Sequence, residues 1–329
     1  MNDVGFQRAT SVAEALSLGA QPGAAFVAGG TNLIDLMKGG AATPMLLVDV
    51  SRLPLTTVMP RAGGGIRIGA MVRNSDLANH ALVRARYPLL AQALVSGASP
   101  QLRNMATVGG NLLQRTRCYY FYDTAFASCN KRVPGSGCAA REGYNRIHAI
   151  LGASGACVAT QPSDMNVALA ALRAEVVLHG SLGERRVPIG EFHRLPEDTP
   201  QRDANIEPGE LIVAVDLPES PFAAHASYLK VRDRASYAFA LVSVAAALDL
   251  RDDGTVRDAA LVLGGVAHMP WRVASAEQAL IGSRLDDTSI AMAASRLLAG
   301  ARPLRHNAFK VELARRSIAR ALKTARGMA

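Results

Sequence analysis

The four cysteines of this 329-residue chain are crowded into one short segment. Cys118, Cys129, Cys138 and Cys157 lie within 40 residues of each other, with ten, eight and eighteen residues between them. The surrounding stretch, residues 115–156, is rich in glycine, arginine and aromatic residues and shows neither helical nor strand periodicity. A segment that lacks regular structure and holds every thiol of the chain is predicted to be organised by something that it binds.

Three kinds of site use four cysteines. Two disulfides need an oxidising compartment, and residues 1–8 show no basic segment leading into a long apolar run, as a signal peptide would. Structural zinc usually takes cysteines in C-x₂₋₄-C pairs, and none of these intervals is that short. A [4Fe–4S] cluster also takes four thiolates and can collect them from wider loops. The spacing therefore favours an iron–sulfur cluster and leaves disulfides and zinc open.

The residues around the cysteines suit a cluster. A sheath of aromatic side chains would keep water off a metal, and cationic side chains would offset the negative charge of thiolate ligands. The aromatic residues are Tyr119, Tyr120, Phe121, Tyr122, Phe126 and Tyr144, and the basic residues are Arg115, Arg117, Lys131, Arg132, Arg141 and Arg146. Ordinary packing and an ordinary solvated surface would also explain these residues.

Two glycine pairs elsewhere in the chain indicate a phosphate-bearing ligand. The first lies in VAGGT at 27–31, after an apolar strand-like stretch and before a predicted helix, and the second lies in TVGGN at 107–111. Glycines in such turns let successive backbone N–H groups face one anion. One such turn is weak evidence, but two similar loops can grip a diphosphate from both sides. Neither fits G-x-G-x-x-G or G-x-x-x-x-G-K-[ST], which disfavours a Rossmann or P-loop site.

The length and composition favour two folded domains with normal cores. Hydrophobic residues make up 49% of the chain and charged residues 19%, and no stretch reaches the roughly 18 uninterrupted apolar residues of a membrane span. The net charge of +9 comes mainly from arginine, which suits phosphates and acidic partners. Because the basic residues are scattered and no nucleic-acid motif is present, we do not expect nucleic acid as a partner.

Several local patterns predict regular structure. Ser11 and Glu14 form a capping-box pattern that predicts a helix to about Leu18. A helix is expected from Asp76 to about Ser96, broken at Pro88. The apolar residues of 309–323 alternate with basic ones, as in a packed surface helix.

Three motifs resemble the FAD-binding motifs of a known family, the medium subunits of the xanthine dehydrogenase and aldehyde oxidoreductase (molybdenum hydroxylase) family. They are VAGGTN at 27–32, ATVGGN at 106–111 and QPSD at 161–164. The resemblance extends to 210–212, 230–240 and 263–268, and so covers nearly the whole chain.

The cysteine segment resembles one branch of this family. Most members pass almost directly from the second glycine loop to the Pro-Ser-Asp stretch, whereas here about 40 residues intervene. The insertion is similar to that in the FAD subunit of periplasmic aldehyde oxidoreductase, which carries a [4Fe–4S] cluster. The match runs through QRTRC at 114–118, CNKR at 129–132 and PGSGC at 134–138.

The resemblance implies an α+β fold. Family members have a PCMH-type FAD-binding fold of two subdomains, followed by a smaller C-terminal α+β domain like that of CO dehydrogenase flavoproteins. Here the FAD-binding domain would cover residues 1–220, with the [4Fe–4S]-binding insertion at about 115–157. The C-terminal domain would cover residues 225–329 after a linker at 219–224.

The resemblance also implies which residues bind the cofactors. The first glycine loop would hold the FAD diphosphate from one side and the second from the other. Asp164 would accept hydrogen bonds from sugar or ribityl hydroxyls, Ile212 would contact the ligand, and Lys230 would lie near the isoalloxazine. The cofactor-binding residues are thus Phe26, Val27, Ala28, Gly29, Gly30, Thr31, Asn32, Leu33, Thr107, Gly109, Gly110, Asn111, Asp164, Ile212 and Lys230, and the metal ligands are Cys118, Cys129, Cys138 and Cys157. Arg234 and Tyr237 are weaker candidates for the exposed face of the flavin.

The function implied by the resemblance is electron transfer within a heterotrimer. A large partner subunit with a molybdenum cofactor would oxidise an aldehyde, and electrons would pass through [2Fe–2S] centres of a small partner to FAD in this chain and on to an external acceptor. No residue of this chain would be catalytic toward the substrate. NAD-reducing relatives can carry an acidic residue about where Tyr237 falls, so NAD is not expected as the acceptor.

The resemblance also bears on the compartment of the protein, and the residues leave one other class of function open. The resemblance implies a periplasmic protein, exported as a folded complex through a partner's signal, with the cytoplasm as the alternative. A zinc-stapled nucleotide-binding module without redox activity is the alternative function, since it would explain the charge and the cysteines. It would not explain the paired glycine loops together with Lys230.

Overall fold

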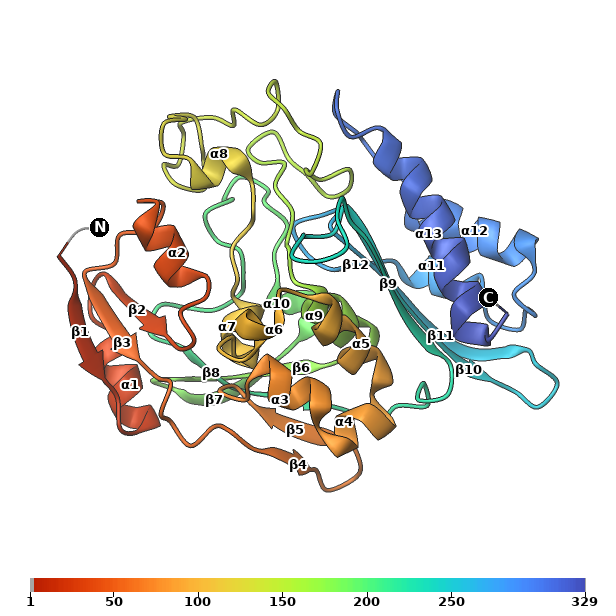
Figure 1. Cartoon of the computed structure of the whole chain (residues 1–329), viewed down its shortest axis with the longest axis horizontal. Coiled ribbons are helices and arrows are strands. Elements are labelled where there is room, and N and C mark those ends of the chain that lie inside the picture. The colour runs from red at the N-terminus through yellow and green to blue at the C-terminus, as the bar shows by residue number, and fades with distance from the viewer. Residues whose placement is uncertain (1–2, 329) are drawn as a thin grey trace.

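The structure is a computed structural model that describes residues 3–328, and its helices pack around three β-sheets (Figure 1). The N-terminal sheet has three parallel strands in the order β1 (Gly5–Arg8), β3 (Leu46–Asp49) and β2 (Ala24–Val27). Parallel neighbours need a crossover connection, and α1 (Val12–Gly19) and α2 (Leu33–Lys38) lie in the connections between these strands.

The predicted capping box starts α1. The Ser11 hydroxyl accepts a hydrogen bond from the Glu14 backbone N–H at 3.1 Å. The Glu14 carboxylate accepts from the backbone N–H of Thr10 at 2.8 Å, one residue before the cap position. These contacts satisfy donors that would otherwise have no partner at the start of the helix.

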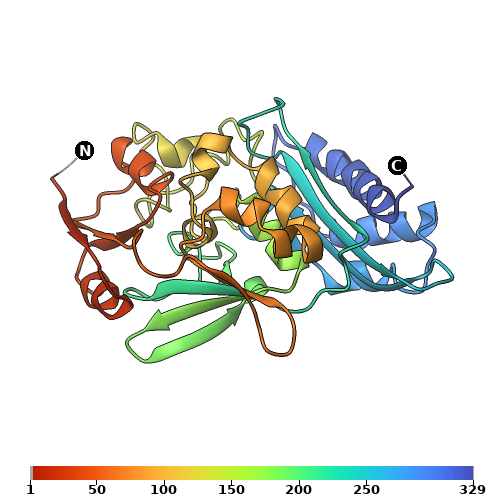
Figure 2. The same cartoon turned by 60° about the horizontal axis from the view of Figure 1, so that its bottom comes forward.

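A five-stranded antiparallel sheet forms the floor of the half of the molecule built by residues 3–220 (Figure 2). Its order is β4 (Val58–Pro60), β5 (Ile66–Gly69), β8 (Leu211–Leu217), β6 (Glu175–Gly180) and β7 (Gly183–Pro188). The central strand β8 is buried along its whole length. It pairs with β5, although a helical layer and the cysteine segment separate the two strands in the sequence.

Three short helices replace the single broken helix predicted between Asp76 and Ser96. They are α3 (Asn74–Asn79), α4 (Ala81–Arg86) and α5 (Pro88–Ser96). The expected break at Pro88 is present, since proline stands at the first position of α5. A second break falls at His80, whose backbone is extended (φ −66°, ψ 130°) and which ends α3 and begins α4. The shorter helices that follow are α6 (Pro100–Arg103), α7 (Val108–Leu112), α8 (Tyr119–Tyr122), α9 (Asp164–Ala171) and α10 (Ile189–Phe192).

The C-terminal sheet is antiparallel and buried on both faces. Its order is β12 (Trp271–Arg272), β11 (Val256–Gly264), β10 (Val242–Leu250) and β9 (Ala226–Val231). One face packs against α11 (Ala274–Gln278), α12 (Asp287–Leu297) and α13 (Phe309–Arg326), and the other packs against α5 and α9 (Figure 1).

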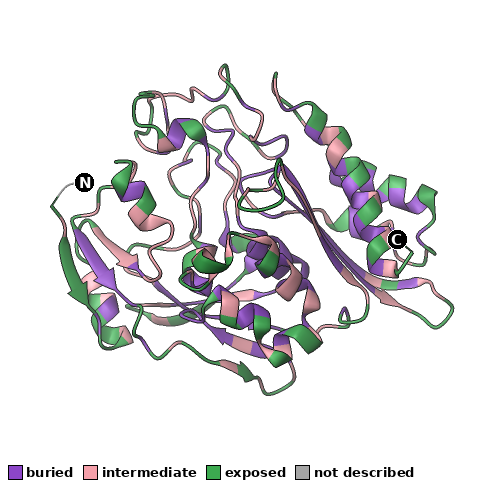
Figure 3. Cartoon of the chain, viewed as in Figure 1, coloured by how far each residue is buried: buried purple, intermediate pink, exposed green. Residues whose placement is uncertain are grey.

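The two faces of β10 belong to different cores. Val244, Ala246 and Leu248 pack in the core under the C-terminal helices, whereas Ala245 and Ala247 pack in the core formed mainly by residues before 220. Side chains alternate across a strand. Because both faces of β10 are buried, its sequence is an apolar run instead of an alternation of apolar and polar residues. Small alanines on one face let the two halves of the chain approach closely. Figure 3 draws most of this sheet as buried ribbon.

The cysteine segment between α7 and α9 is a series of turns with one short helix, α8 (Figure 1). It lies over the space between the N-terminal sheet and the C-terminal helices. The predicted lack of periodicity is therefore present in the structure. Among residues 3–328, no helix has both the length and the apolar character needed to cross a membrane.

Candidate functional site

The largest cavity, about 850 Å³, runs between the N-terminal half and the loop that follows β9. This volume is in the range of cofactor pockets. Its walls are the loop after β2, the loop before α7, the start of α9 and residues 233–241. Four segments far apart in the sequence thus meet around one space.

The two glycine loops lie against each other at this cavity. A Cβ atom on Gly29 would lie 1.9 Å from the Met105 carbonyl oxygen, a separation that no side chain can adopt. Gly30 has φ +69°, in the left-handed region that favours glycine. Gly109 donates its N–H to the Ala70 carbonyl at 2.8 Å, and a Cβ there would press on Ala70. Only glycine allows this close approach, which exposes backbone on both sides of the cavity.

Side chains of the second loop hold its geometry. The Thr107 hydroxyl accepts from the Gly110 N–H at 3.2 Å and caps α7. Asn111 accepts from the Ser163 hydroxyl at 2.7 Å, and Ser163 in turn accepts from the Asn166 N–H at 3.1 Å. The loop is thereby fastened to the start of α9.

A buried ion pair stands behind the cavity wall at the start of α9. The Lys230 ammonium donates to one Asp164 oxygen at 2.7 Å, and the Tyr228 hydroxyl donates to the other at 2.7 Å. The Lys230 and Asp164 side chains are 4% and 7% exposed. Burial, reinforced by the Asp164 charge, holds the pKa of Tyr228 well above its usual range, so Tyr228 remains a neutral donor.

Most of the cofactor-binding residues predicted from the sequence lie on the cavity wall. Thirteen of the fifteen line it: Phe26, Ala28, Gly29, Gly30, Thr31, Asn32, Leu33, Thr107, Gly109, Gly110, Asn111, Asp164 and Ile212. Val27 instead packs in a small core with Met37 and Leu47. Lys230 lies behind Asp164 and does not line the cavity.

Several cavity residues carry no signal in the sequence. Asn74 and Arg103 line the cavity from α3 and α6, outside every motif. Gln161, the first residue of QPSD, and Phe239, in the resembling stretch 230–240, line it too, although neither was predicted as a cofactor contact. The weaker candidates Arg234 and Tyr237 line it as well. Isolated polar and aromatic residues without a motif become recognisable only once the fold brings them together.

The four cysteines gather in a second site beside this cavity. Cys118, Cys129 and Cys157 are buried in one cluster with Tyr120 and Phe121, and Cys138 packs against it. Cys129 and Cys138 face each other across an isolated antiparallel bridge. All four thiols are free, so no disulfide forms in the described part of the chain.

Backbone N–H groups point at three of the sulfur atoms. Tyr120 and Phe121 direct theirs at Cys118, and Ala159 directs its N–H at Cys157. Cys138 receives three such bonds, from Ala140, Arg141 and Val158, and a further bond from the Cys157 side chain. Hydrogen bonds to sulfur of this kind stabilise thiolates and tune iron–sulfur centres.

The pKa values of these thiols differ in direction. Burial raises the pKa of Cys118 to about 12, whereas the hydrogen bond from Cys157, helped by the backbone donors, lowers the pKa of Cys138 to about 6. The shared bond with Cys138, together with burial, raises the pKa of Cys157. Thiols buried in this way become ligands when a bound cation replaces their protons.

A four-thiolate cluster fits this donor set. In residues 3–328, no group of three or more His, Cys, Asp or Glu side chains is already arranged to hold a metal ion. A [4Fe–4S] core, being larger than a single ion, needs four thiols placed around a pocket. The gathering of the four cysteines in one buried cluster, the aromatic residues packed with them and the N–H groups near the sulfur atoms suit such a core.

Side-chain hydrogen bonds stabilise the cysteine segment, which lacks the regular backbone hydrogen bonds of helices and strands. Arg132 donates to the carbonyls of Tyr120 and Phe121 at 2.7 and 2.9 Å, at the end of α8. The fully buried Asn145 donates to the carbonyls of Ala140, Arg141 and Gly143. Turns braced by side chains produce no sequence period, which explains why no helix or strand could be predicted here.

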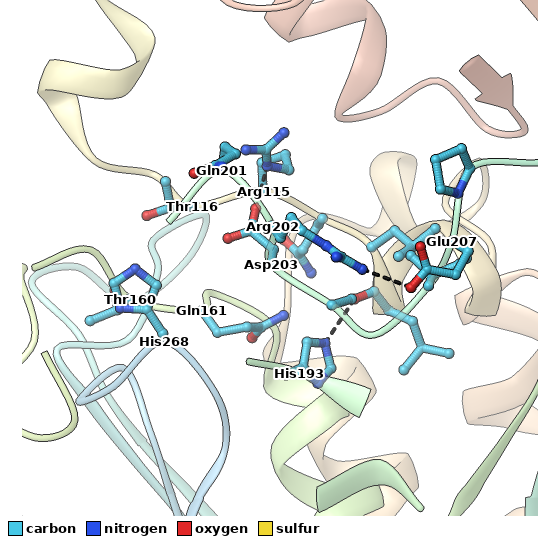
Figure 4. A pocket seen from close by; sticks show the side chains of 16 residues that line it. Arg115, Thr116, Thr160, Gln161, His193, Gln201, Arg202, Asp203, Glu207 and His268 are labelled. Carbon is cyan, nitrogen blue, oxygen red and sulfur yellow. Dashed lines mark hydrogen bonds and ion pairs between the residues drawn. The ribbon is translucent and has the colours of Figure 1, made fainter. Parts of the chain in front are cut away.

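A second cavity, about 550 Å³, adjoins the largest one and is shown in Figure 4. The charged residues on its wall are paired with one another. Arg202 donates to Glu207 at 2.8 Å, and Asp203 pairs with both Arg115 and the buried Lys131. These two cations hold the pKa of Asp203 below its usual value despite its burial. Lys131 follows Cys129 closely, so this ion network anchors the cysteine segment to the loop before β8.

Comparison with known proteins agrees with this geometry. Residues 2–220 match the family described as the FAD binding domain in molybdopterin dehydrogenase. Residues 227–325 match the CO dehydrogenase flavoprotein C-terminal domain.

Individual relatives share the whole length. The chain is 51% identical over 328 residues to the aldehyde oxidoreductase FAD-binding subunit PaoB of Escherichia coli, covering 98% of each protein. It is 28% identical to the glyceraldehyde dehydrogenase medium chain of Sulfolobus acidocaldarius, covering 89% of this chain and 86% of the relative. Carbon monoxide dehydrogenase from Hydrogenophaga pseudoflava superposes with a TM-score of 0.77 at 26% identity, covering 100% of this chain and 99% of its own.

The paired glycine loops, the α+β architecture and the two family matches lead to one conclusion. The chain contains an FAD-binding domain followed by a CO dehydrogenase flavoprotein-type C-terminal domain, and it belongs to the family of FAD-binding subunits of molybdenum hydroxylases.

Proposed function

We propose that this chain is the FAD- and [4Fe–4S]-containing electron-transfer subunit of a molybdenum-dependent aldehyde oxidoreductase. In this role it receives electrons from [2Fe–2S] centres of a partner subunit and delivers them through FAD to an external acceptor. The observation that carries the proposal is that the four cysteines gather in one cluster of buried side chains beside a cavity walled by two facing glycine loops. The 51% identity to an aldehyde oxidoreductase subunit supports the substrate class.

The residues of the chain position the cofactors. The loop at Gly29 and Gly30 would present backbone N–H groups to a diphosphate. In the second loop the N–H groups of Gly109 and Gly110 are donated to Ala70 and Thr107, so its glycines would serve by letting the backbone approach the ligand closely. Ile212 and Met71 supply apolar wall. Cys118, Cys129, Cys138 and Cys157 would hold the cluster, and the aromatic side chains of α8 exclude water from it. When bound, FAD and the cluster supply the redox chemistry, and the protein supplies orientation and electrostatics.

Cofactor analysis of anaerobically purified protein tests the proposal. We expect about one FAD, with four iron atoms and four acid-labile sulfides per chain, since four thiolates ligate one such cluster. The absorption spectrum should show flavin bands over a broad iron–sulfur shoulder. A colourless protein that holds zinc, or a flavoprotein with no acid-labile sulfide, would contradict the cluster.

Two variants separate the sites. Cys129→Ser should lose iron while keeping most of the FAD, because Cys129 is buried among the other cysteines and does not line the largest cavity. Gly30→Val should lose FAD while keeping iron, because φ +69° is strained for a branched residue and Ile34 lies 3.0 Å from the new Cβ. Gly190→Val is the matched control, since no atom lies within 4 Å of its Cβ position. Iron that survives each cysteine substitution in turn would overturn the ligand assignment.

The partners and acceptor belong to the same proposal. Co-expression with a molybdenum-cofactor large subunit and a [2Fe–2S] small subunit should yield a heterotrimer that oxidises aldehydes. We expect activity with artificial dyes or oxygen and none with NAD, since Tyr237 stands where NAD-reducing relatives can carry an acidic residue. Aldehyde-dependent reduction of NAD would contradict this acceptor assignment.

We also propose that the complex is periplasmic and exported in folded form through the small subunit's signal. Cell fractionation tests this, because deleting the partner's signal should leave this chain in the cytoplasm with its cofactors bound. A chain found in the cytoplasm while the partner's signal is intact supports the cytoplasmic alternative.

A further inference from the structure

The side chain of Asn32 links the first glycine loop to the cysteine segment. Asn32 stands just before α2 but makes no side-chain cap to that helix. Its Oδ1 accepts from the backbone N–H of Arg115 at 2.8 Å, and its Nδ2 donates to the Tyr122 hydroxyl at 3.1 Å. Both polar ends of a residue on the wall of the largest cavity are therefore engaged by the cysteine segment.

Arg117 completes this junction. Its guanidinium donates to the Tyr122 hydroxyl at 2.5 Å and pairs with Asp35 of α2 at 3.3 Å. It also lies over the rings of Tyr122 and Phe239, with centroids at 5.3 and 4.8 Å. Arg117 and Phe239 both line the largest cavity. The glycine loop, the cysteine segment and the loop after β9 thus meet at one arginine.

The junction is directly connected to a cysteine. Arg117 precedes Cys118, and Tyr122 ends the helical turn that Cys118 begins. Phe121, which packs in the cysteine cluster, meets the Tyr122 ring at 5.9 Å. Any displacement of Cys118 that accompanies loss of a bound group therefore moves Arg117 and Tyr122, and with them Asn32.

We propose that Asn32 and Tyr122 are positioning residues that couple the two cofactor sites. A cluster bound at the cysteines fixes Tyr122 and Arg117, which fix the cavity wall at Asn32, so FAD binds more tightly when the cluster is present. Because coupling between binding sites is reciprocal, FAD also strengthens retention of the cluster. The inference rests on the proposed function, since it requires a cluster at these cysteines.

Equilibrium binding of FAD tests the coupling in the full chain. The FAD dissociation constant is measured from flavin fluorescence in protein with its cluster and in protein stripped of iron by a chelator. For the unchanged chain we expect affinity to fall at least about fivefold on stripping, the lower end of typical coupling. For Tyr122→Phe, which keeps the ring but removes the hydroxyl, the ratio of the two constants should approach one.

Tyr144→Phe is the matched control, because Tyr144 lies in the same segment, is half exposed and does not line the cavity. It should keep the ratio of the unchanged chain. Tyr122 does not line the cavity either, so its effect on FAD must pass through Asn32 and Arg117. In the reciprocal experiment, saturating FAD should raise the fraction of iron retained against a chelator, and Tyr122→Phe should abolish that protection.

The outcomes distinguish this inference from the proposed function. Absence of iron and sulfide from the unchanged chain overturns the proposed cluster and the coupling with it. If the cluster is present but the FAD affinity is equal before and after the iron is stripped, the coupling is overturned and the proposed function stands. If Tyr122→Phe weakens FAD binding equally with and without the cluster, Tyr122 has a merely structural role and the coupling is also overturned.

Discussion

Gly29 sets how closely the two glycine loops can approach. Its missing side chain leaves room for the Met105 carbonyl, which belongs to the backbone of the opposite loop. Rigid backbone cannot move aside as the end of a flexible side chain can, so this position tolerates no other residue. The glycine that follows, Gly30, is required instead by its left-handed conformation.

Gly29→Ala is therefore expected to separate the loops. A Cβ placed 1.9 Å from the Met105 oxygen forces one loop outward, and we expect FAD affinity to fall by tenfold or more together with a loss of stability of about 1–3 kcal/mol. Flavin retention on desalting and urea unfolding measure the two effects. Gly190→Ala, in open space on α10, should change neither. A Gly29→Ala protein that binds FAD normally would show that the loops do not need this contact.

His268 makes the fold sensitive to acid. It is 5% exposed and lies near Lys131, Asp203 and His148. Burial, assisted by the Lys131 charge, lowers the pKa of His268 to about 3. Burial lowers the pKa of His148, which lies 3.1 Å from the Cys118 sulfur, to about 4. Both imidazoles are thus neutral in the folded protein at neutral pH.

The sign of the pH dependence follows from these values. The unfolded chain takes up protons on both histidines below about pH 6.5, while the folded chain does not, so stability falls as the pH falls. Each histidine contributes a slope of about 1 kcal/mol per pH unit well below pH 6.5. Burial also lowers the pKa of the fully buried His193. His268→Gln should therefore remove roughly a third of the combined slope of the three histidines between pH 7.5 and 5 in urea unfolding, whereas His179→Gln serves as control. An unchanged slope in His268→Gln would show that His268 is charged in the fold.

Residue-scale features were predictable where the chemistry is local. Gly29, Gly30 and Thr107 lie in motifs whose turn geometry is determined by residues next to each other in the sequence, and all three line the cavity. The position of Lys230 beside the flavin stays a prediction, and the structure shows Lys230 paired with Asp164, which lines the cavity. That pairing depends on where β9 packs against α9, which no local pattern records.

The cysteine segment shows how an element can lack periodicity and still be ordered. Asn145, Arg132 and Asn130 bond to backbone groups across its turns, and residues from α13 and the loop before it clamp it from the C-terminal side. Asn307 donates to the carbonyls of His148 and Ala149 at 3.1 and 3.2 Å. The segment is therefore part of both halves of the chain.

Lys310, near the start of α13, is the strongest of these clamps. Its ammonium is fully buried and donates to the carbonyls of Gly265 and His148 at 2.6 and 2.9 Å. Burial lowers the pKa of Lys310 to about 7. The amphipathic pattern of residues 309–323 predicted the helix, but not that a lysine on it would be buried, because its acceptors come from loops distant in the sequence.

Lys310→Met should loosen the cysteine segment. The substitution keeps the apolar stem but leaves buried carbonyls without a donor, at a cost of about 2–4 kcal/mol. Hydrogen exchange of residues 145–151 should accelerate, and urea unfolding should report the loss. Lys323 lies on the same helix as Lys310, and Lys323→Met removes only an exposed ion pair with Asp287 of α12. Its free energy of unfolding should stay within about 0.5 kcal/mol of that of the unchanged chain. Equal effects of the two variants would mean that the buried ammonium does not hold the segment.

At the scale of the whole molecule, the two halves of the chain share a core. The alanine face of β10 packs on the FAD-domain half, and its other face packs under α13. The amphipathic C-terminal helix was predictable from the period of residues 309–323. Helix α12 was missed, although Asp286 caps it by accepting from the Ser289 N–H at 2.7 Å. The meeting of the halves was not predictable, because it depends on which apolar strand covers which helix.

The Asp164–Lys230 ion pair joins these two halves at the cavity, since Asp164 begins α9 and Lys230 lies on β9. Removing either charge leaves the other buried without its partner, which costs about 3–5 kcal/mol. We expect Lys230→Met and Asp164→Asn each to lower the free energy of unfolding by that amount. Lys230→Met should also weaken FAD binding, because Asp164 lines the cavity and loses the cation that holds it.

The double variant Lys230→Met with Asp164→Asn is the decisive measurement. With no charge left buried, it should recover much of the lost stability, so its cost falls well short of the sum of the two single costs. The matched control is the exposed pair Arg173 and Asp258, whose substitution to Met and Asn should show little coupling. If the costs at Lys230 and Asp164 simply add, the pair does not join the halves electrostatically, and the shared alanine face of β10 and the contacts of Asn307 and Lys310 hold the halves together instead.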